Sequence, residues 1–278
     1  MKNRTFAKFN LHGKTAFVTG GSLGLGYYMA RGLASAGAKI MIAARREGPL
    51  IEAAKKLEKE SGGNQVLYTC VDLNDDKSIQ EAADFANSRL NGVDIYVGNA
   101  GIDVQSKVDD ITEEQIQSTF QVNYSANIFL IKRFLPHMRA KRWGRIILSA
   151  SIASIRAPVE GLSVYSSAKA AVNAYAKVAA AELGQSGITV NSLNIGSFLT
   201  DMLLELYENV AKSSNEFTVD SLMRRSASNT ALGRLGNPEE IEGLVQLLAS
   251  DAGSYITGAN LPIDGGQSIL LRPIPLPD

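Results

Sequence analysis

The chain has 278 residues and no net charge at neutral pH, because 28 lysines and arginines balance 28 aspartates and glutamates. Binding to nucleic acid through charge alone is not expected, since such binding usually depends on a basic footprint. The apolar runs fall far short of the roughly 20 residues that a membrane span requires, and the basic first residues lead into no apolar segment of a secretory signal, so we expect no membrane partner.

Short apolar, β-branched runs alternate along the chain with longer segments of helical spacing. The predicted strands cover residues 15–19, 39–43, 66–71, 93–97, 145–149, 188–193 and 260–263. The predicted helices cover residues 24–36, 49–60, 76–90, 112–139, 164–183 and 238–249. Continuously apolar strands separated by helices are typical of parallel β-α-β units with both sheet faces covered. Because such crossovers are right-handed, we expect an α/β fold with one doubly wound, parallel, seven-stranded sheet of the Rossmann type.

Residues 197–232, between the sixth and seventh predicted strands, break this alternation. The segment begins apolar and then becomes polar and rich in serine. In a doubly wound fold, an insertion at this place projects from the carboxyl edge of the sheet, where ligands bind. We therefore predict a single domain over residues 1–278, with a lid at about 197–232. A C-terminal extension follows at 267–278, and its prolines exclude a helix over 271–278.

Side chains that bind soft metals are scarce. The only two histidines, His12 and His137, have no second soft ligand near them in the sequence, so no metal site is expected. The single cysteine, Cys70, cannot form an internal disulfide and lies in an apolar run, where we expect it to be buried and unreactive. These features fit a protein of a reducing compartment, and we expect it to be cytoplasmic.

The first predicted strand leads directly into the run Thr19-Gly20-Gly21-Ser22-Leu23-Gly24-Leu25-Gly26 and then into a helix. Glycines at such a turn let a pyrophosphate approach the backbone at a helix N-terminus. A flexible loop is the alternative, and the spacing G-x-x-x-G-x-G differs from the common G-x-G-x-x-G, but the place between the first strand and the first helix favours a dinucleotide. No Lys-Ser/Thr pair follows the glycines, which excludes a nucleotide-triphosphate P-loop. The predicted cofactor-binding residues of this turn are Gly20, Ser22, Leu23, Gly24, Leu25 and Gly26.

The second predicted strand ends in Arg45 and Arg46, where NAD-binding proteins place an acid on the ribose 2′-hydroxyl. Two guanidinium groups can instead hold a 2′-phosphate, which favours NADP(H), with NAD(H) as the alternative. The arginines could also simply be solvated residues before the next helix. After the third strand, we expect Asp72 to accept a hydrogen bond from the adenine amino group while Leu73 packs on the ring. Capping of the next helix is the alternative role for Asp72.

A long predicted helix begins with Tyr165-Ser-Ser-Ala-Lys169, which places Tyr165 and Lys169 on one face. The spacing alone is a weak signal, but the chemistry is specific. A phenol has a pKa of about 10, and ionising it near pH 7 needs roughly 4 kcal/mol of stabilisation. We expect Lys169 and the positive nicotinamide ring to supply this, so that Tyr165 gives or takes the proton of a hydroxyl group while a hydride moves to or from the cofactor.

Together, the run 19–26, Gly98-Asn-Ala-Gly101, Ser151, Tyr165-Ser-Ser-Ala-Lys169 and the run 255–266 resemble the short-chain dehydrogenase/reductase family, in the family's order and over nearly the whole chain. The resemblance implies that Ser151 hydrogen-bonds the substrate oxygen and that Asn123 holds a water for proton relay to Lys169. With Tyr165 these residues would form a Ser-Tyr-Lys-Asn tetrad. Without the resemblance, Asn123 would be interpreted as a helix residue that bonds its own backbone. The further cofactor contacts implied are those of Tyr165, Lys169, Asn99, Ala100, Gly101, Gly196, Phe198 and Thr200.

Two positions depart from the family pattern. Gly98 stands where the family more often has a second asparagine, and Ile195 stands where a proline usually precedes Gly196, which would loosen a turn beside the nicotinamide. The family resemblance also implies a homotetramer in which the helices 112–139 and 164–183 pack between subunits. The C-terminal extension is expected to lie across a neighbouring subunit.

The sequence thus predicts an oxidoreductase that transfers a hydride between NADP(H) and a small secondary alcohol or ketone. A catalytically silent dinucleotide-binding redox sensor is the alternative, but a sensor would not need all four positions of the tetrad. An epimerase or dehydratase would require a longer substrate domain. The substrate itself stays open between an apolar ring or chain and a hydroxylated or acidic compound. Val159, Leu162, Met202, Leu206 and Tyr207 could line an apolar pocket, whereas Arg156, Glu160, Arg224 and Arg225 could bind polar groups.

Overall fold

Seven parallel strands form one sheet in the order β3-β2-β1-β4-β5-β6-β7. The computed structural model describes residues 4–156, 160–213 and 216–271. The strand order reverses between β1 and β4, which creates a crevice at the carboxyl ends of these strands, where doubly wound folds bind ligands. The predicted fold class is therefore confirmed. The strands are β1 (Thr15–Thr19), β2 (Lys39–Ala44), β3 (Leu67–Cys70), β4 (Ile95–Gly98), β5 (Gly144–Ser151), β6 (Ile188–Ile195) and β7 (Asn260–Ile263).

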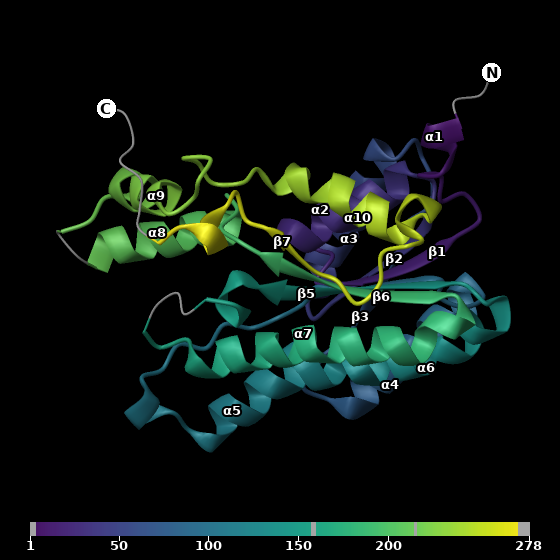
Figure 1. The fold of residues 1–278 in the computed structure, drawn as a ribbon, viewed down its shortest axis with the longest axis horizontal. Coiled ribbons are helices and arrows are strands. Elements are labelled where there is room, and N and C mark those ends of the chain that lie inside the picture. Colours follow the sequence, from purple (N-terminus) through teal and green to yellow (C-terminus); the bar gives the residue numbers. More distant parts are fainter. Residues whose placement is uncertain (1–3, 157–159, 214–215, 272–278) are drawn as a thin grey trace.

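Helices cover both faces of this sheet (Figure 1). One face carries α2 (Gly24–Ser35), α3 (Glu47–Glu60) and α10 (Glu242–Ala249). The other carries α4 (Asp76–Leu90), α5 (Glu113–Phe120), α6 (Ala126–Lys141) and α7 (Ser163–Leu183). A four-residue helix, α1 (Arg4–Ala7), precedes the first strand. Within the described ranges, no helix is both long enough and apolar enough to cross a membrane.

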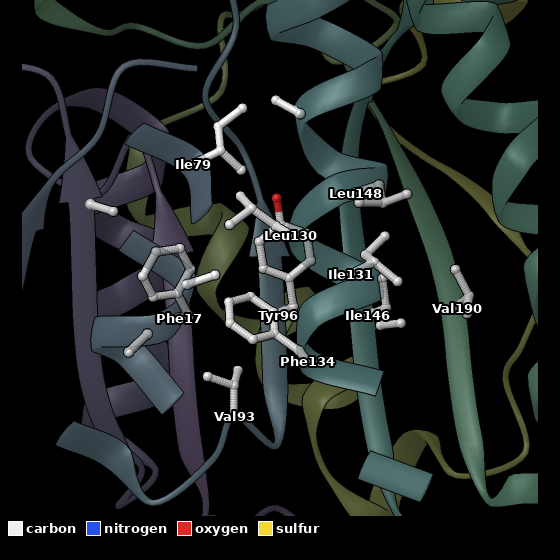
Figure 2. Close-up of a cluster of buried hydrophobic side chains, with 14 of the residues drawn as sticks. Phe17, Ile79, Val93, Tyr96, Leu130, Ile131, Phe134, Ile146, Leu148 and Val190 are labelled. Carbon is white, nitrogen blue, oxygen red and sulfur yellow. The ribbon is translucent and has the colours of Figure 1, made fainter. Parts of the chain in front are cut away.

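An aromatic group under the centre of the sheet fixes α6 against β1 and β4. The side chains of Phe17, Tyr96 and Phe134 are fully buried, and their ring centroids lie 5.4 to 6.4 Å apart (Figure 2). Aromatic contacts of this kind add about 0.5–1.5 kcal/mol each beyond the burial of apolar area. These contacts therefore hold β1, β4 and α6 in fixed positions relative to one another, at the point where the strand order reverses.

The expectation that Cys70 is buried is wrong, and its place at the edge of the sheet explains why. Cys70 is exposed, not buried, because it lies on β3, which is an edge strand with alternating exposure along Leu67–Cys70. An apolar run on an edge strand has one solvent-facing side, unlike a run on a central strand. The inner strands β5 and β6 are instead longer than predicted and extend to Ser151 and Ile195.

The predicted continuous helix 112–139 is interrupted. A π-helical segment, Gln121–Ser125, separates α5 from α6, and in it the Ala126 N–H donates to the Gln121 carbonyl five residues earlier. Such an insertion changes the direction in which carbonyl groups point and is frequent at functional sites. Helical periodicity does not reveal it, because the pattern on either side stays close to 3.6 residues per turn.

The predicted lid contains two helices, α8 (Asp201–Ser213) and α9 (Val219–Ser228), which lie beyond one end of the sheet (Figure 1). The hydroxyl groups of Tyr207 and Ser226 form a hydrogen bond between them. The first part of the C-terminal extension forms a 3-10 turn over Gln267–Ile269, whereas residues 272–278 lie outside the described part of the chain. The assignment of the whole chain to a single domain stays a prediction.

Candidate active site

The glycine-rich turn connects β1 to α2 through a close backbone approach. Gly20 has a φ of 67°, a left-handed conformation that favours glycine. A Cβ atom at Gly26 would lie 2.2 Å from the Gly20 carbonyl oxygen, so no other residue fits there. Asn99, at the end of β4, holds the turn from below: its backbone N–H donates to the Thr19 hydroxyl oxygen (3.0 Å), and its Nδ2 donates to the Thr19 carbonyl (3.3 Å).

The N-terminus of α2 has the chemistry of a phosphate site. Its N-cap, Leu23, offers no side-chain hydrogen bond, and its first turn contains no acidic residue. The first backbone N–H groups therefore have no side-chain cap, and the positive end of the helix dipole points into the turn. A Cβ atom at Gly24 would meet nothing within 4 Å, so the space above the turn is open. These features fit the pyrophosphate of a dinucleotide.

Arg45 and Arg46 are exposed where β2 passes into α3. Among residues 4–156, 160–213 and 216–271, no ion pair or side-chain hydrogen bond occupies either guanidinium group. Both arginines are therefore free to bind an anion at the edge of the crevice.

Asp72 does not cap the helix that follows β3, so that alternative is wrong. The N-cap of α4 is Asp75, whose carboxylate accepts from the Lys77 N–H (2.9 Å), whereas Asp72 accepts from the Asn74 N–H (2.9 Å) within the preceding turn. Leu73 is buried in the hydrophobic cluster on the α4 side of the sheet. Contact of Asp72 and Leu73 with an adenine ring stays a prediction.

Ser151, Tyr165 and Lys169 meet at the carboxyl end of β5. Ser151 is the last residue of β5, and its Oγ accepts from the Ala153 N–H (3.1 Å). Its side chain lies near enough to the Tyr165 hydroxyl to lower the pKa of that phenol. Lys169, one turn further along α7, is only 4% exposed. Its Nζ donates to the Ser149 carbonyl (2.8 Å) and lies 5.7 Å from the centroid of the Tyr165 ring.

Burial opposes the charges that this group needs for acid–base chemistry. It raises the pKa of the Tyr165 phenol, an effect that the Ser151 side chain partly offsets and the negative charge of Asp103 reinforces. It also lowers the pKa of Lys169 to about 8. Both groups are desolvated, and the Lys169 ammonium is directed at a backbone carbonyl. The expected lowering of the Tyr165 pKa by Lys169 together with the nicotinamide ring stays a prediction.

Asn123 clamps the chain beside Lys169. Its Nδ2 donates to the Ile102 carbonyl (2.9 Å), and its Oδ1 accepts from the Ile102 N–H (3.1 Å). The interpretation of Asn123 as a helix residue that bonds its own backbone is thus wrong. A Cβ atom at Gly101 would lie 2.5 Å from Asn123 Oδ1 and 3.3 Å from Lys169 Nζ, so Gly101 allows these two side chains to share one wall of the site.

The loop after β6 carries Gly196, Phe198 and Thr200. β6 stays paired with β7 through Ile195 and Ile263, directly before Gly196. Gln267 closes the loop, because its Oε1 accepts from the Ser197 N–H (3.1 Å) and hydroxyl (3.2 Å). A single glutamine beyond the last strand gives no sequence signal for this role.

A Cβ at Gly196 would lie 2.5 Å from the Asp264 Cβ, so the loop packs directly against the segment after β7. Thr200 Oγ1 accepts from the Leu203 N–H (3.3 Å) at the start of α8, and Phe198 is buried. Their contact with a nicotinamide carboxamide stays a prediction.

Several residues suggested for substrate binding already have protein partners. Arg156 Nη1 donates to the Gln267 carbonyl (2.6 Å), Glu160 pairs with Lys107 (3.3 Å), and Tyr207 bonds Ser226. Met202 and Leu206 are exposed on α8, whereas Val159 lies outside the described residues. Arg224 and Arg225 lie on α9.

A cavity of about 690 Å³ lies beside the start of α7. Ser154, Leu162 and Ser166 line part of it, but Ser151 and Tyr165 do not. The cavity is therefore a neighbour of the candidate centre and not the centre itself.

A buried polar network that the sequence did not reveal supports the serine loop from behind. Ser154 Oγ donates to the Ser151 carbonyl, and Asn173 Nδ2 donates to Ser154 Oγ (2.7 Å) and to Asn194 Oδ1 (2.8 Å). Ser192 Oγ in turn donates to Asn173 Oδ1 (2.6 Å). These bonds tie β5, α7 and β6 together directly behind Ser151.

Comparison with known proteins gives matches over most of the chain. The family model for short chain dehydrogenases matches residues 14–211. The diacetyl reductase, (S)-acetoin forming, of Staphylococcus epidermidis is 33% identical over 254 residues, which cover 91% of this chain and 98% of the relative. L-sorbose reductase from Gluconobacter frateurii, solved with NADPH and L-sorbose, matches with a TM-score of 0.90 at 29% identity, over 95% of this chain and 100% of that one. A 3-oxoacyl (acyl-carrier-protein) reductase from Agrobacterium tumefaciens with NADP bound matches with a TM-score of 0.85 at 27% identity, over 96% and 98%.

The buried ammonium of Lys169 predicts a specific dependence of stability on pH. Its pKa is about 8 in the folded protein and 10.5 when unperturbed. Between these values the unfolded chain binds more protons, so the free energy of unfolding rises with pH in this window. Relative to Lys169→Met, the wild type should gain about 3 kcal/mol between about pH 8 and pH 10.5. Urea denaturation of both proteins across this range measures the gain, and a pH-independent difference between them would contradict it.

Proposed function

The chain belongs to the short-chain dehydrogenase/reductase family, and from this premise we propose that it transfers a hydride between NADP(H) and a secondary alcohol or ketone. The proposal rests on one observation above all: Tyr165 lies beside Ser151, one helical turn from the buried Lys169. A phenol, a hydroxyl donor and an ammonium at the mouth of a dinucleotide crevice are the groups that carbonyl reduction requires.

A bound nicotinamide would supply or accept the hydride. Ser151 already accepts the Ala153 N–H, so its own proton can be directed at a substrate oxygen. Tyr165 gives a proton to that oxygen during reduction and takes it back during oxidation. The ammonium of Lys169 stabilises the phenolate that reduction leaves, and Asn123 holds a water through which Lys169 and Tyr165 exchange protons with solvent.

NADP(H) is the proposed cofactor, with NAD(H) as the weaker alternative. The uncapped N-terminus of α2 receives the pyrophosphate, and the free guanidinium groups of Arg45 and Arg46 receive the 2′-phosphate. Two of the similar structures contain NADPH or NADP, which supports this choice.

The proposed substrate is a small carbonyl compound or the corresponding alcohol. Similar proteins are named for diacetyl and for L-sorbose, which share a ketone beside another oxygen function. The exposed carboxylate of Asp103, whose charge acts on Tyr165, provides a hydrogen-bond acceptor suited to such a second group.

Assembly as a cytoplasmic homotetramer completes the proposal. Ile116, Phe129 and Val178, on α5, α6 and α7, are large apolar side chains that remain exposed on this single chain. Apolar surface on neighbouring helices of a soluble enzyme is typical of a subunit contact.

Replacement of the phenol tests the function directly. Tyr165→Phe should lower kcat for ketone reduction by a factor of about 100 or more, because the proton donor is lost. NADPH binding, followed by its fluorescence, should change by less than about threefold, because the ring and the neighbouring Lys169 stay in place. A panel of diketones, ketoses and cyclic ketones provides the substrates.

Tyr175→Phe is the matched control, since it removes another hydroxyl from the same helix, and it should keep wild-type turnover. If the wild type binds NADPH but oxidises it with none of these ketones, the redox sensor becomes the better explanation.

The choice of cofactor depends on the arginines after β2. Arg45→Ala should raise the KM for NADPH about 10- to 100-fold through loss of charge-assisted hydrogen bonds to the 2′-phosphate. The KM for NADH should change less than about threefold, which makes NADH the internal control. Steady-state kinetics with both cofactors measure the ratio, and an unchanged ratio in Arg45→Ala and in Arg46→Ala would exclude this role for the two arginines.

A further inference from the structure

Asn127 on α6 connects two buried polar groups next to the candidate site. The Tyr96 hydroxyl donates to Asn127 Oδ1 (2.7 Å), and Asn127 Nδ2 donates to the main-chain oxygen of Asn123 (3.0 Å). Tyr96 is fully buried and Asn127 is 5% exposed. Because the oxygen and the nitrogen of the amide each have a buried partner, only one orientation of this side chain is satisfied.

Gly98, at the end of β4, provides the space for this amide. A Cβ atom at Gly98 would lie 2.1 Å from Asn127 Oδ1 and 2.9 Å from Leu148 Cδ2. No larger residue fits there while Asn127 keeps its place. At the position of Gly98 the family more often has an asparagine. In this chain, Asn127 on the facing helix places its amide in the space that Gly98 leaves.

The carbonyl that Asn127 holds lies in the π-helical segment Gln121–Ser125, where the hydrogen-bond register of the helix changes. Its own residue, Asn123, clamps Ile102 through two hydrogen bonds. Gly101, the residue before Ile102, lies between Asn123 Oδ1 and Lys169 Nζ. A movement of Asn123 would therefore change the wall against which Lys169 is buried.

We propose that Asn127 is a positioning residue for the Lys169 side of the site and that Tyr96 fixes its orientation. This inference rests on the proposed function, in which Asn123 holds a water for the proton relay. A carbonyl oxygen has two lone pairs, so the bond from Asn127 fixes its direction and leaves one lone pair for a water. Without the Asn127 amide, the carbonyl loses a buried donor and the π-helical segment can shift. Proton transfer then slows, while cofactor and substrate contacts remain.

Two substitutions test the positioning role of Asn127 by removing different hydrogen bonds. Asn127→Leu removes both hydrogen bonds at similar volume, whereas Tyr96→Phe removes only the hydroxyl that orients the amide. For alcohol oxidation, Asn127→Leu should lower kcat about tenfold with KM changed less than about threefold. It should also move the rise of kcat with pH to higher pH by about half a pH unit or more, because the phenol loses its proton less readily. Tyr96→Phe should move the profile in the same direction by less, and NADPH binding should be unchanged in both.

Asn87→Leu is the matched control. Asn87 on α4 also donates from its amide to a carbonyl of α6, that of Arg133 (3.3 Å), but it is not among the candidate site residues. Thermal denaturation shows whether Asn87→Leu and Asn127→Leu lose stability alike, but the pH profile of Asn87→Leu should be that of the wild type. Gly98→Ala should reproduce the pH shift with Asn127 intact, because the added Cβ displaces the amide.

The outcomes separate the two proposals. If the wild type turns over and both Asn127→Leu and Tyr96→Phe keep its pH profile, the positioning role is wrong and the proposed function stands. If the wild type turns over no alcohol or ketone, both are wrong.

Discussion

The site depends on one electrostatic problem, the burial of a phenol beside an ammonium. Desolvation disfavours both charged forms, and it raises the pKa of Tyr165 while it lowers that of Lys169 to about 8. Burial therefore works against both charges of the pair. In the proposed function, the positive nicotinamide of an oxidised cofactor would supply the missing stabilisation of the phenolate.

The surrounding fold keeps this pair in place with buried polar contacts. The aromatic cluster beneath β1 and β4 sets the position of α6, and the interruption between α5 and α6 brings Asn123 to Ile102. On the other side, Ser154, Asn173 and Asn194 support the strand end that carries Ser151. Buried polar groups are stabilising only when each has a partner, so these networks leave the site little freedom to rearrange. Such rigidity is what a catalytic group needs when its pKa depends on distances of a few ångströms.

The sequence was sufficient for the fold class, and the motif residues Ser151, Tyr165 and Lys169 lie together in the structure. Apolar strands between helices predicted the parallel sheet, and β1, α4 and β7 have the predicted bounds. Residues that act through tertiary contacts escaped prediction: Asn127, Asn173 and Gln267 belong to no motif, and their partners lie far away in the sequence or across a helix break. The exposure of Cys70 was missed because the order of strands in a sheet cannot be derived from local periodicity. The π-helical segment was missed because local periodicity does not show a change of hydrogen-bond register.

The most direct test of this account is an ultraviolet titration of the Tyr165 phenol, taken as the difference between the wild type and Tyr165→Phe. Without cofactor, the phenol should titrate above its ordinary pKa of 10.0, because burial outweighs the effect of the Ser151 side chain. Saturating NADP⁺ should lower that pKa by about two pH units or more, as expected for a positive charge a few ångströms away. A pKa at or below the ordinary value in the cofactor-free protein, or one that NADP⁺ leaves unchanged, would contradict the account.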